Sequence, residues 1–162
     1  MKIMNKLQNR KEELKKNNKG FSLVELIIVI AIMAILVGVV GTQVIPYINK
    51  SKESKDFQIV SSYGTAAMTA YSSNAGNITI PASNKIEFTV YGTNAADPEK
   101  LLSNEIKNLT YSADTGMKDK FKSTKGKTIT DIKITYDFGA KTITAQATDG
   151  TNDILDPVVS DM

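Results

Sequence analysis

The distribution of apolar residues divides the chain into three parts of different character. Residues 1–20 are polar and rich in Lys and Asn, the next stretch is almost wholly apolar, and beyond Pro46 apolar and polar residues alternate with short periods. No charged or hydrogen-bonding side chain occurs from Leu26 to Val40, and the run stays largely apolar to Ile45. A helix over this run is about 30 Å long, which is enough to cross a bilayer. The pattern therefore predicts a membrane-spanning helix.

Beyond Pro46 the apolar residues recur at steps of three and four, the period of an amphipathic helix. The positions on this predicted face are Ile48, Phe57, Val60, Tyr63 or Gly64, Ala67, Met68 and Tyr71. We expect the helix to end at residues 72–76, where weak helix formers precede a glycine. The result is one helix of about 50 residues, apolar all round at first and one-sided later. Such a helix suits a subunit whose first half is buried among copies and whose second half packs on its own head.

The remainder of the chain predicts a small head built mostly of strands. Apolar and polar residues alternate from Ile86 through Phe88 to Val90, as they do in a half-buried strand, and Ile78 and Ile80 precede them. A hairpin is indicated further on, because two alternating runs flank a turn at residues 139–141. Its expected inward positions are Ile132, Ile134, Tyr136 and Phe138 in the first run and Ile143, Ala145 and Ala147 in the second.

A short helix and a polar segment separate these predicted strands. Asp97, Pro98 and Glu99 have the order of an N-cap, a first-position proline and an acidic first turn, so a helix is expected to run to about Lys107. Residues 108–127 are polar and Lys-rich. The tail is expected to dock on the sheet through Ile154, Leu155, Val158 and Val159. A long helix followed by strands predicts an α+β fold.

Charge is distributed unevenly between the first twenty residues and the rest. The whole chain carries a formal charge of +3. Residues 1–20 hold seven basic residues against Glu12 and Glu13, a net charge of +5, so the remainder carries −2. Basic residues beside a span are retained on the cytoplasmic side, which places the head outside. The sequence contains no Cys, so an exported head relies on its core or on assembly rather than on a disulfide.

Glu25 is the ionisable residue that borders the apolar run. A carboxylate inside an apolar span costs about 2.5–3.5 kcal/mol unless something neutralises it. A partner for this charge is therefore implied, and the alternative is a carboxyl group that stays protonated or lies at the level of the lipid headgroups.

The sequence Gly20-Phe21-Ser22-Leu23-Val24-Glu25, followed by a long aliphatic helix, resembles the class III signal of type IV pilins and of their relatives, the type II secretion pseudopilins and competence pilins. The resemblance covers about residues 15–60. It implies that a membrane aspartyl peptidase cuts after Gly20 and methylates the new N-terminus at Phe21. The subclass stays open, because Phe at the new N-terminus is typical of one subclass and a twenty-residue leader of the other.

The resemblance also implies an architecture and a set of partners. Residues 1–20 are then a cleaved cytoplasmic leader, 21–45 the transmembrane and assembly helix, 46–75 its amphipathic continuation, and 76–162 an extracellular α+β head with a small antiparallel sheet. The implied protein is a type IV pilus subunit, the major one, with adhesion, twitching motility, aggregation and biofilm formation as its outputs. Its implied partners are copies of itself, the prepilin peptidase and methyltransferase, the assembly platform with its ATPase, and the membrane before assembly. The resemblance implies no cofactor and no specific nucleic acid.

In a filament of this kind, Glu25 is expected to meet the N-terminal amine of a neighbouring copy, because it does not easily reach the amine of its own helix. The small residues of the span lie close to one helical face and are expected at helix contacts, although such residues are common in any membrane helix. They are Ala31, Ala34, Gly38 and Gly41. With Pro46, the two glycines predict a kink or a locally melted stretch near residues 38–46.

Two further groups of residues are candidate functional sites. The cluster Lys118, Lys120, Lys122, Lys125 and Lys127 suggests contact with an anionic polymer, and a solvated edge strand guarded by lysines explains it equally simply. The group Asp149, Asn152, Asp153 and Asp156 lacks the spacing of a calcium-binding loop and is expected to cap turns, so no metal site is predicted. The chain has no His and no Cys, which gives acid-base and nucleophilic catalysis little foothold, and an enzyme is not expected.

Two alternative functions remain open from the sequence. The first is a pseudopilin or competence pilin, which shares the same processing chemistry. The second is a secreted or membrane-tethered binding domain with an ordinary signal peptide cut near Gly41, or with an anchor that is never cut.

Overall fold

The structure is a computed structural model that describes residues 20–162. The expected leader therefore lies outside the described residues, except for Gly20. The chain divides into two compact units, of which the first ends at Ile45 and the second comprises Pro46–Met162. Each unit is described in its own right.

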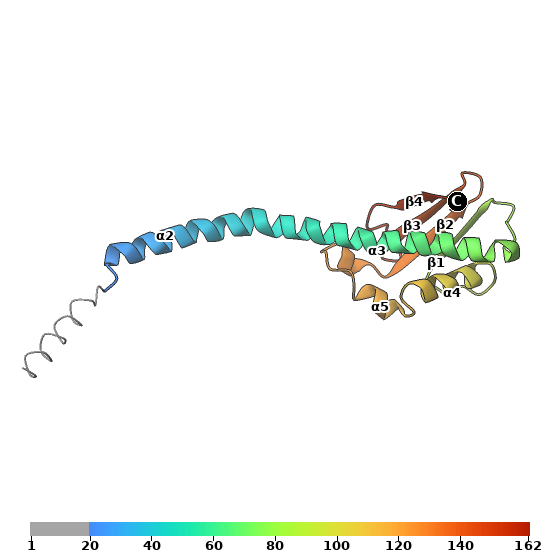
Figure 1. Ribbon diagram of the computed structural model, residues 1–162, viewed down its shortest axis with the longest axis horizontal. Coiled ribbons are helices and arrows are strands. Elements are labelled where there is room, and N and C mark those ends of the chain that lie inside the picture. The colour runs from blue at the N-terminus through green and yellow to red at the C-terminus, as the bar shows by residue number, and fades with distance from the viewer. Residues whose placement is uncertain (1–19) are drawn as a thin grey trace, which may run out of the picture. The chain divides into compact units, whose positions relative to one another are not determined.

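The first unit is an apolar helix. Helix α2 (Leu23–Val39) begins after Ser22 and buries none of its residues within the chain. Helical backbone extends from Leu23 to Asn77, and among the described residues this is the one stretch long and apolar enough to cross a membrane. The long N-terminal helix expected from the hydrophobic pattern is thus confirmed (Figure 1).

A π-helical segment, η1 (Val40–Val44), follows α2 directly. The amide of Ile45 donates to the carbonyl of Val40, five residues back, and the Thr42 hydroxyl donates to the carbonyl of Gly38 at 3.1 Å. Pro46 explains the wider turn, because proline offers no amide proton and its ring clashes with the carbonyl four residues earlier. The backbone remains helical throughout, so no melted stretch forms, and the irregularity near residues 38–46 is this π-helical turn.

The second unit opens with the long helix α3 (Ile45–Asn74), which a short 3-10 turn, η2 (Ala75–Asn77), extends. The buried residues of α3 are Asp56, Val60, Tyr63, Gly64, Ala66, Ala67 and Ala70. The predicted face is confirmed at its centre but is wrong at Ile48 and Phe57, which are 47% and 38% exposed. Small residues supply much of the buried face, so the helix approaches the sheet closely; a Cβ added at Gly64 would lie 3.4 Å from the Val158 side chain.

The sheet has four antiparallel strands in the order β1-β2-β3-β4. Their bounds are β1 (Lys85–Thr89), β2 (Asp131–Asp137), β3 (Thr142–Thr148) and β4 (Val158–Asp161). Ile134 faces Phe88 on one side and Ala145 on the other, and all three are buried. The predicted hairpin is therefore confirmed, and with α3 the sheet gives the expected α+β fold.

The connection from β1 to β2 contains three short helical elements. They are α4 (Glu99–Leu109), α5 (Asp114–Lys118) and the 3-10 turn η3 (Gly126–Thr128). Helix α4 is present as expected, but Pro98 rather than Asp97 occupies its N-cap position. Proline at this position costs no intrahelical hydrogen bond, because the amides at a helix start lack intrahelical partners in any case.

Two polar-apolar segments of the head lie outside the strands. Ile78 and Ile80 precede β1 without forming a strand, and Ile80 is 50% exposed. The lysine-rich segment forms no edge strand, because the amides of Lys122 and Ser123 donate to the Asp56 carboxylate of α3 rather than to a neighbouring strand. The tail does pair with β3 through β4, although Val159 faces solvent.

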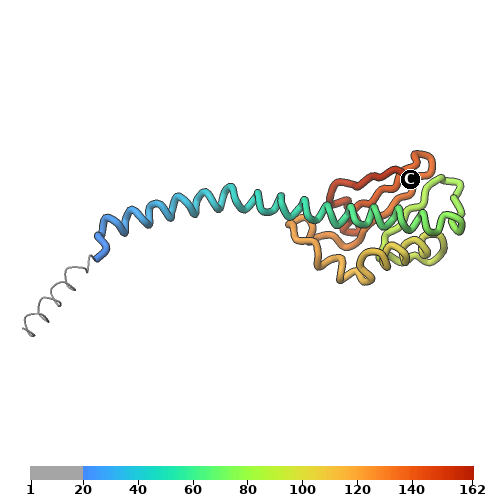
Figure 2. Tube along the Cα trace, in the orientation of Figure 1, coloured from blue at the N-terminus to red at the C-terminus, as the bar shows by residue number. Residues whose placement is uncertain are grey.

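The core of the second unit lies between α3 and the inner face of the sheet. Val60, Tyr63 and Ala67 of α3 are fully buried, as are Ile134 and Tyr136 of β2. The Tyr136 hydroxyl donates to the carbonyl of Ala67 at 2.8 Å and so ties the helix to the sheet. Helices α4 and α5 lie on the other side of α3 from β3 and β4, as the chain trace shows (Figures 1 and 2). Both helices contribute to the same core, through Leu102 and Ile106 of α4 and Met117 of α5.

Candidate functional site

The segment just before α2 is extended and open. Ser22 has φ −66° and ψ 141°, and neither Gly20 nor Phe21 belongs to a helix or strand. Phe21 is 89% exposed, and a Cβ added at Gly20 would meet no atom within 4 Å. The peptide bond between Gly20 and Phe21 is therefore accessible.

Ser22 and Glu25 form a capping box at the start of α2. The Ser22 amide donates to Glu25 Oε2 at 2.9 Å, and the Ser22 hydroxyl accepts from the Val24 amide at 3.3 Å. This arrangement pairs two of the amide donors that a helix start leaves free. The carboxylate also lies at the positive end of the helix dipole. One oxygen of Glu25 thus has a partner within its own chain.

The apolar surface of α2 has no protein cover in the single chain. All its residues are exposed, from Leu23 at 73% to Val39 at 46%. An aliphatic surface of this size needs lipid or other protein around it, because contiguous exposed apolar patches are otherwise rare. The small residues expected at helix contacts lie within this exposed surface, and a Cβ at Gly38 or Gly41 would meet open space. Their contact role stays a prediction.

The five lysines of the expected anionic-polymer surface are exposed but differ in their surroundings. Lys118 pairs with Asp114 at 2.9 Å, and Lys125 lies 3.9 Å from Glu53. The amine of Lys120 lies 5.9 Å from the centre of the Tyr111 ring. In the described part of the chain, Lys122 and Lys127 have no ion-pair partner. The structure thus spreads these lysines over the end of α5, a loop and η3, and polymer contact stays a prediction.

A buried carboxylate that the sequence analysis missed holds this loop in place. Asp56 of α3 is fully buried, and its two oxygens accept from the amides of Lys122 and Ser123, each at 2.9 Å. Two turns earlier in the same helix, Asn49 Oδ1 accepts from the amide and the hydroxyl of Thr124, both at 2.9 Å. The available signal was the position of Asp56, which is four residues before Val60 on the buried face.

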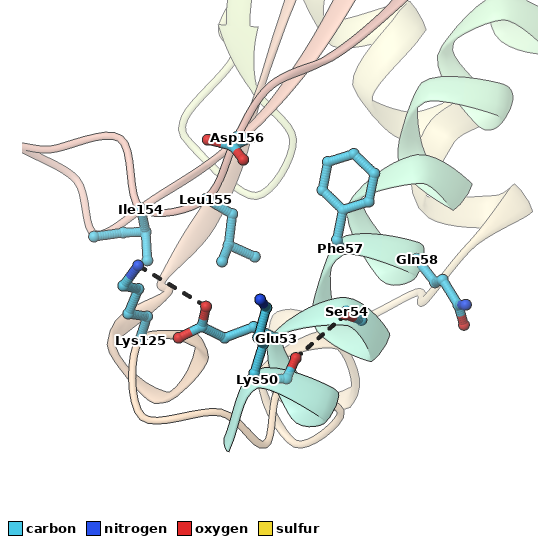
Figure 3. Close-up of a pocket in the computed structure, with 9 residues that line it drawn as sticks. All are labelled: Lys50, Glu53, Ser54, Phe57, Gln58, Lys125, Ile154, Leu155 and Asp156. Carbon is cyan, nitrogen blue, oxygen red and sulfur yellow. Dashed lines mark hydrogen bonds and ion pairs between the residues drawn. The ribbon is translucent and has the colours of Figure 1, made fainter. Parts of the chain in front are cut away.

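A pocket of about 510 Å³ lies beside the first turns of α3 in the second unit (Figure 3). Its lining combines the apolar side chains of Phe57, Ile154 and Leu155 with the paired charges of Glu53 and Lys125. The other residues that line it are Lys50, Ser54, Gln58 and Asp156. Among residues 20–162, no group of three or more His, Cys, Asp or Glu side chains could hold a metal ion.

The acidic residues near the C-terminus are engaged in turns. Asp149 accepts from the amides of Thr151 and Asn152 at 2.8 and 2.7 Å. The bonds from Asn152 first and Thr151 second hold the pKa of Asp149 below its ordinary value. Asp153 pairs with Lys133 at 3.0 Å. These contacts favour the capping role expected for the group.

A polar cluster inside the head contains a second carboxylate with a shifted pKa. Asp131 Oδ1 accepts from the amides of Tyr91 and Ile132 at 3.0 and 2.7 Å. Burial raises the pKa of Asp131, although the bonds from the Tyr91 and Ile132 amides oppose the shift. The hydroxyls of Tyr63 and Tyr91 lie 2.7 Å apart nearby. This network joins α3, the loop after β1 and the start of β2.

Comparison with protein families gives one match. The model of the prokaryotic N-terminal methylation motif matches residues 15–41, which include the segment before α2, the capping box and all of α2. The comparisons with curated proteins and with solved structures give no match.

Proposed function

We propose, from the type IV pilin-like class III signal that residues 15–41 carry, that the protein is a structural subunit of a type IV pilus, and its major one. The match confirms the type IV pilin-like class III signal seen in the sequence and supports a pilin-type or pseudopilin-type protein. The observation that carries the proposal further is that this signal leads directly into an apolar helix that no described residue covers.

In this proposal the prepilin peptidase hydrolyses the bond between Gly20 and Phe21. Hydrolysis leaves a carboxylate on Gly20 and an amine on Phe21, and the amine keeps its positive charge after a single methylation. The exposure of residues 20–22 and the extended backbone of Ser22 support this step. Before assembly, the basic leader stays in the cytoplasm, α2 crosses the membrane and the head lies outside.

Assembly then exchanges lipid for protein around the apolar helix. The platform and its ATPase move the subunit into a bundle of identical helices, in which residues 21–45 pack on neighbouring copies. Ala31, Ala34, Gly38 and Gly41 let helix backbones approach closely, and Pro46 sets the end of the π-helical segment. Glu25 pairs with the N-terminal amine of another copy, so that a wrongly docked subunit leaves two charges unpaired. Adhesion, twitching motility and biofilm formation are the outputs proposed for the filament.

Replacement of Glu25 tests this function. Glu25→Ala and Glu25→Gln both remove the charge, and we expect filament yield to fall at least tenfold while the subunit remains in the membrane, because tenfold corresponds to only about 1.4 kcal/mol. The yield is measured by electron microscopy and by the amount of subunit in sheared filaments. Normal yield of full-length filaments from both variants would refute the proposed pairing.

A pseudopilin or competence pilin is the second candidate, because the matched motif covers only residues 15–41 and leaves the head unassigned. The two candidates differ in the length of the fibre. Long surface filaments in electron micrographs support the pilus, and short structures confined to the cell envelope support the second candidate.

A further inference from the structure

We propose that Ser22 is a positioning residue for subunit docking: it holds one oxygen of Glu25 within its own chain and thereby presents the other to the amine of the incoming copy. This inference rests on the proposed function and assigns a role to a residue that the function does not otherwise use. It starts from the two hydrogen bonds of the capping box at the head of α2.

The bond to Oε2 fixes the direction of the Glu25 side chain. An unrestrained glutamate on a helix surface occupies several rotamers, and burial in one of them costs about 1.5–2 kcal/mol of conformational entropy. The bond from the Ser22 amide at 2.9 Å selects the rotamer that turns back toward the helix start. Among residues 20–162, no donor is bonded to Oε1, so that oxygen remains available to a second copy.

This bond survives processing. The donor is the amide of Ser22, which belongs to the peptide bond between Phe21 and Ser22, and the proposed cut falls one bond earlier. The capping box can therefore be present in the precursor, in the mature subunit in the membrane and in the filament. It also lessens the cost of the carboxylate in lipid before a neighbour arrives, since a paired charge at a helix N-terminus is less unfavourable than a free one.

Ser22 positions the amine as well. Because Ser22 is the N-cap, its backbone is extended and α2 begins only at Leu23. The new amine of Phe21 thus lies outside the helix, one residue before the cap, where its protons do not enter the helical hydrogen bonds. Both partners of the intersubunit contact, the carboxylate and the amine, are placed by one residue.

Four single substitutions in the full-length precursor separate this role from the charge itself. Ser22→Ala keeps the backbone amide that donates to Glu25 but removes the hydroxyl that accepts from Val24 and holds the helix start in its capped form, whereas Ser22→Thr keeps both. Glu25→Asp keeps the charge but is too short to complete the box, whereas Glu25→Gln completes the box without the charge. Processing is followed by the mass of the mature subunit, and assembly by filament yield.

We expect all four variants to be processed. Filament yield should fall about fivefold for Ser22→Ala and for Glu25→Asp, the change expected from loss of an N-cap interaction, while Ser22→Thr assembles as the unmodified chain does. Normal assembly of Ser22→Ala and Glu25→Asp, with failure of Glu25→Gln, would overturn the positioning role and leave the charge pairing intact. Normal assembly of Glu25→Gln would instead refute the proposed charge pairing, and an unmodified chain that forms no filaments would refute the proposed function. A Ser22→Ala subunit that is not cleaved would also contradict the inference, because its defect would precede docking.

Discussion

At the scale of single residues, the head depends on a few buried polar contacts that join segments distant in sequence. Asp56 illustrates this, because its fully buried carboxylate accepts from two amides 66 and 67 residues further along. Leaving such buried donors without a partner costs about 1–3 kcal/mol. Asp56 therefore fixes the loop of residues 122–126 against α3.

Gly126 gives a direct test of this packing. A Cβ at position 126 would overlap with Oδ2 of Asp56 and lie 2.9 Å from its Cγ, so Gly126→Ala should destabilise the fold by about 1–3 kcal/mol. Gly116→Ala is the matched control, because the added Cβ would meet its nearest atom at 3.7 Å. Urea unfolding of the full chain in detergent, followed by tyrosine fluorescence, measures both. Unfolding of Gly126→Ala at the urea concentration of the unmodified chain would contradict the account.

The contribution of Asp131 to the stability of the fold should depend on pH with the opposite sign to that of the surface carboxylates. Burial raises the pKa of Asp131, so the native state binds more protons than the unfolded state, and stability falls as pH rises from about 4 through the raised pKa. Asp131→Asn retains an oxygen that can accept from Tyr91 and Ile132 but has no charge to desolvate. We expect its stability relative to the unmodified chain to increase between pH 4 and pH 7.

The control for this comparison lies within the protein. Hydrogen bonds from Ala140 and then Lys85 lower the pKa of Asp137, so its contribution is present above the ordinary Asp value and is lost as pH falls through the lowered pKa. The Asp137 contribution to stability is lost at a more acidic pH, and this loss occurs equally in Asp131→Asn and in the unmodified chain. A stability difference between Asp131→Asn and the unmodified chain that stays constant from pH 4 to pH 7 would disprove the assignment to Asp131.

At the scale of elements, local sequence patterns predicted the structures whose causes are local. The long helix follows from its apolar run and its period, and the hairpin from two alternating runs around residues 139–141. Ser22 and Glu25 have the spacing of a capping box, so this part of the candidate site was also readable from the sequence. The conformation of the lysine-rich loop could not be predicted from the sequence, because it depends on Asp56 in a distant helix. The contacts proposed between α2 and another copy cannot be predicted from the pattern of a single chain either.

The π-helical segment η1 should depend on Pro46. Pro46→Ala restores an amide that can donate to the carbonyl of Thr42, and we expect ordinary α-helical bonding to replace the wider turn. Hydrogen exchange of the full chain in detergent should then show slower exchange of the amides of residues 42–45. Pro81→Ala, a change outside the helices, is the control and should leave these amides unaffected. Unchanged exchange in Pro46→Ala would show that the segment has another cause.

At the scale of the whole molecule, the two units differ in how their apolar residues are covered. The first unit carries the N-terminal methylation motif and an apolar helix that buries none of its residues, and the second has a core of its own. If the first unit assembles the filament as proposed, the surface of the second unit determines what the filament contacts. The exposed lysines of residues 118–127 and the pocket beside α3 belong to that surface.

The mature N-terminus tests the central claim most directly. Intact mass and terminal sequencing of the protein recovered from the cell surface should show a chain that begins with methylated Phe21. A chain that begins near residue 42, or one that retains Met1, would contradict the account, because the proposed assembly contact requires the amine that cleavage after Gly20 creates.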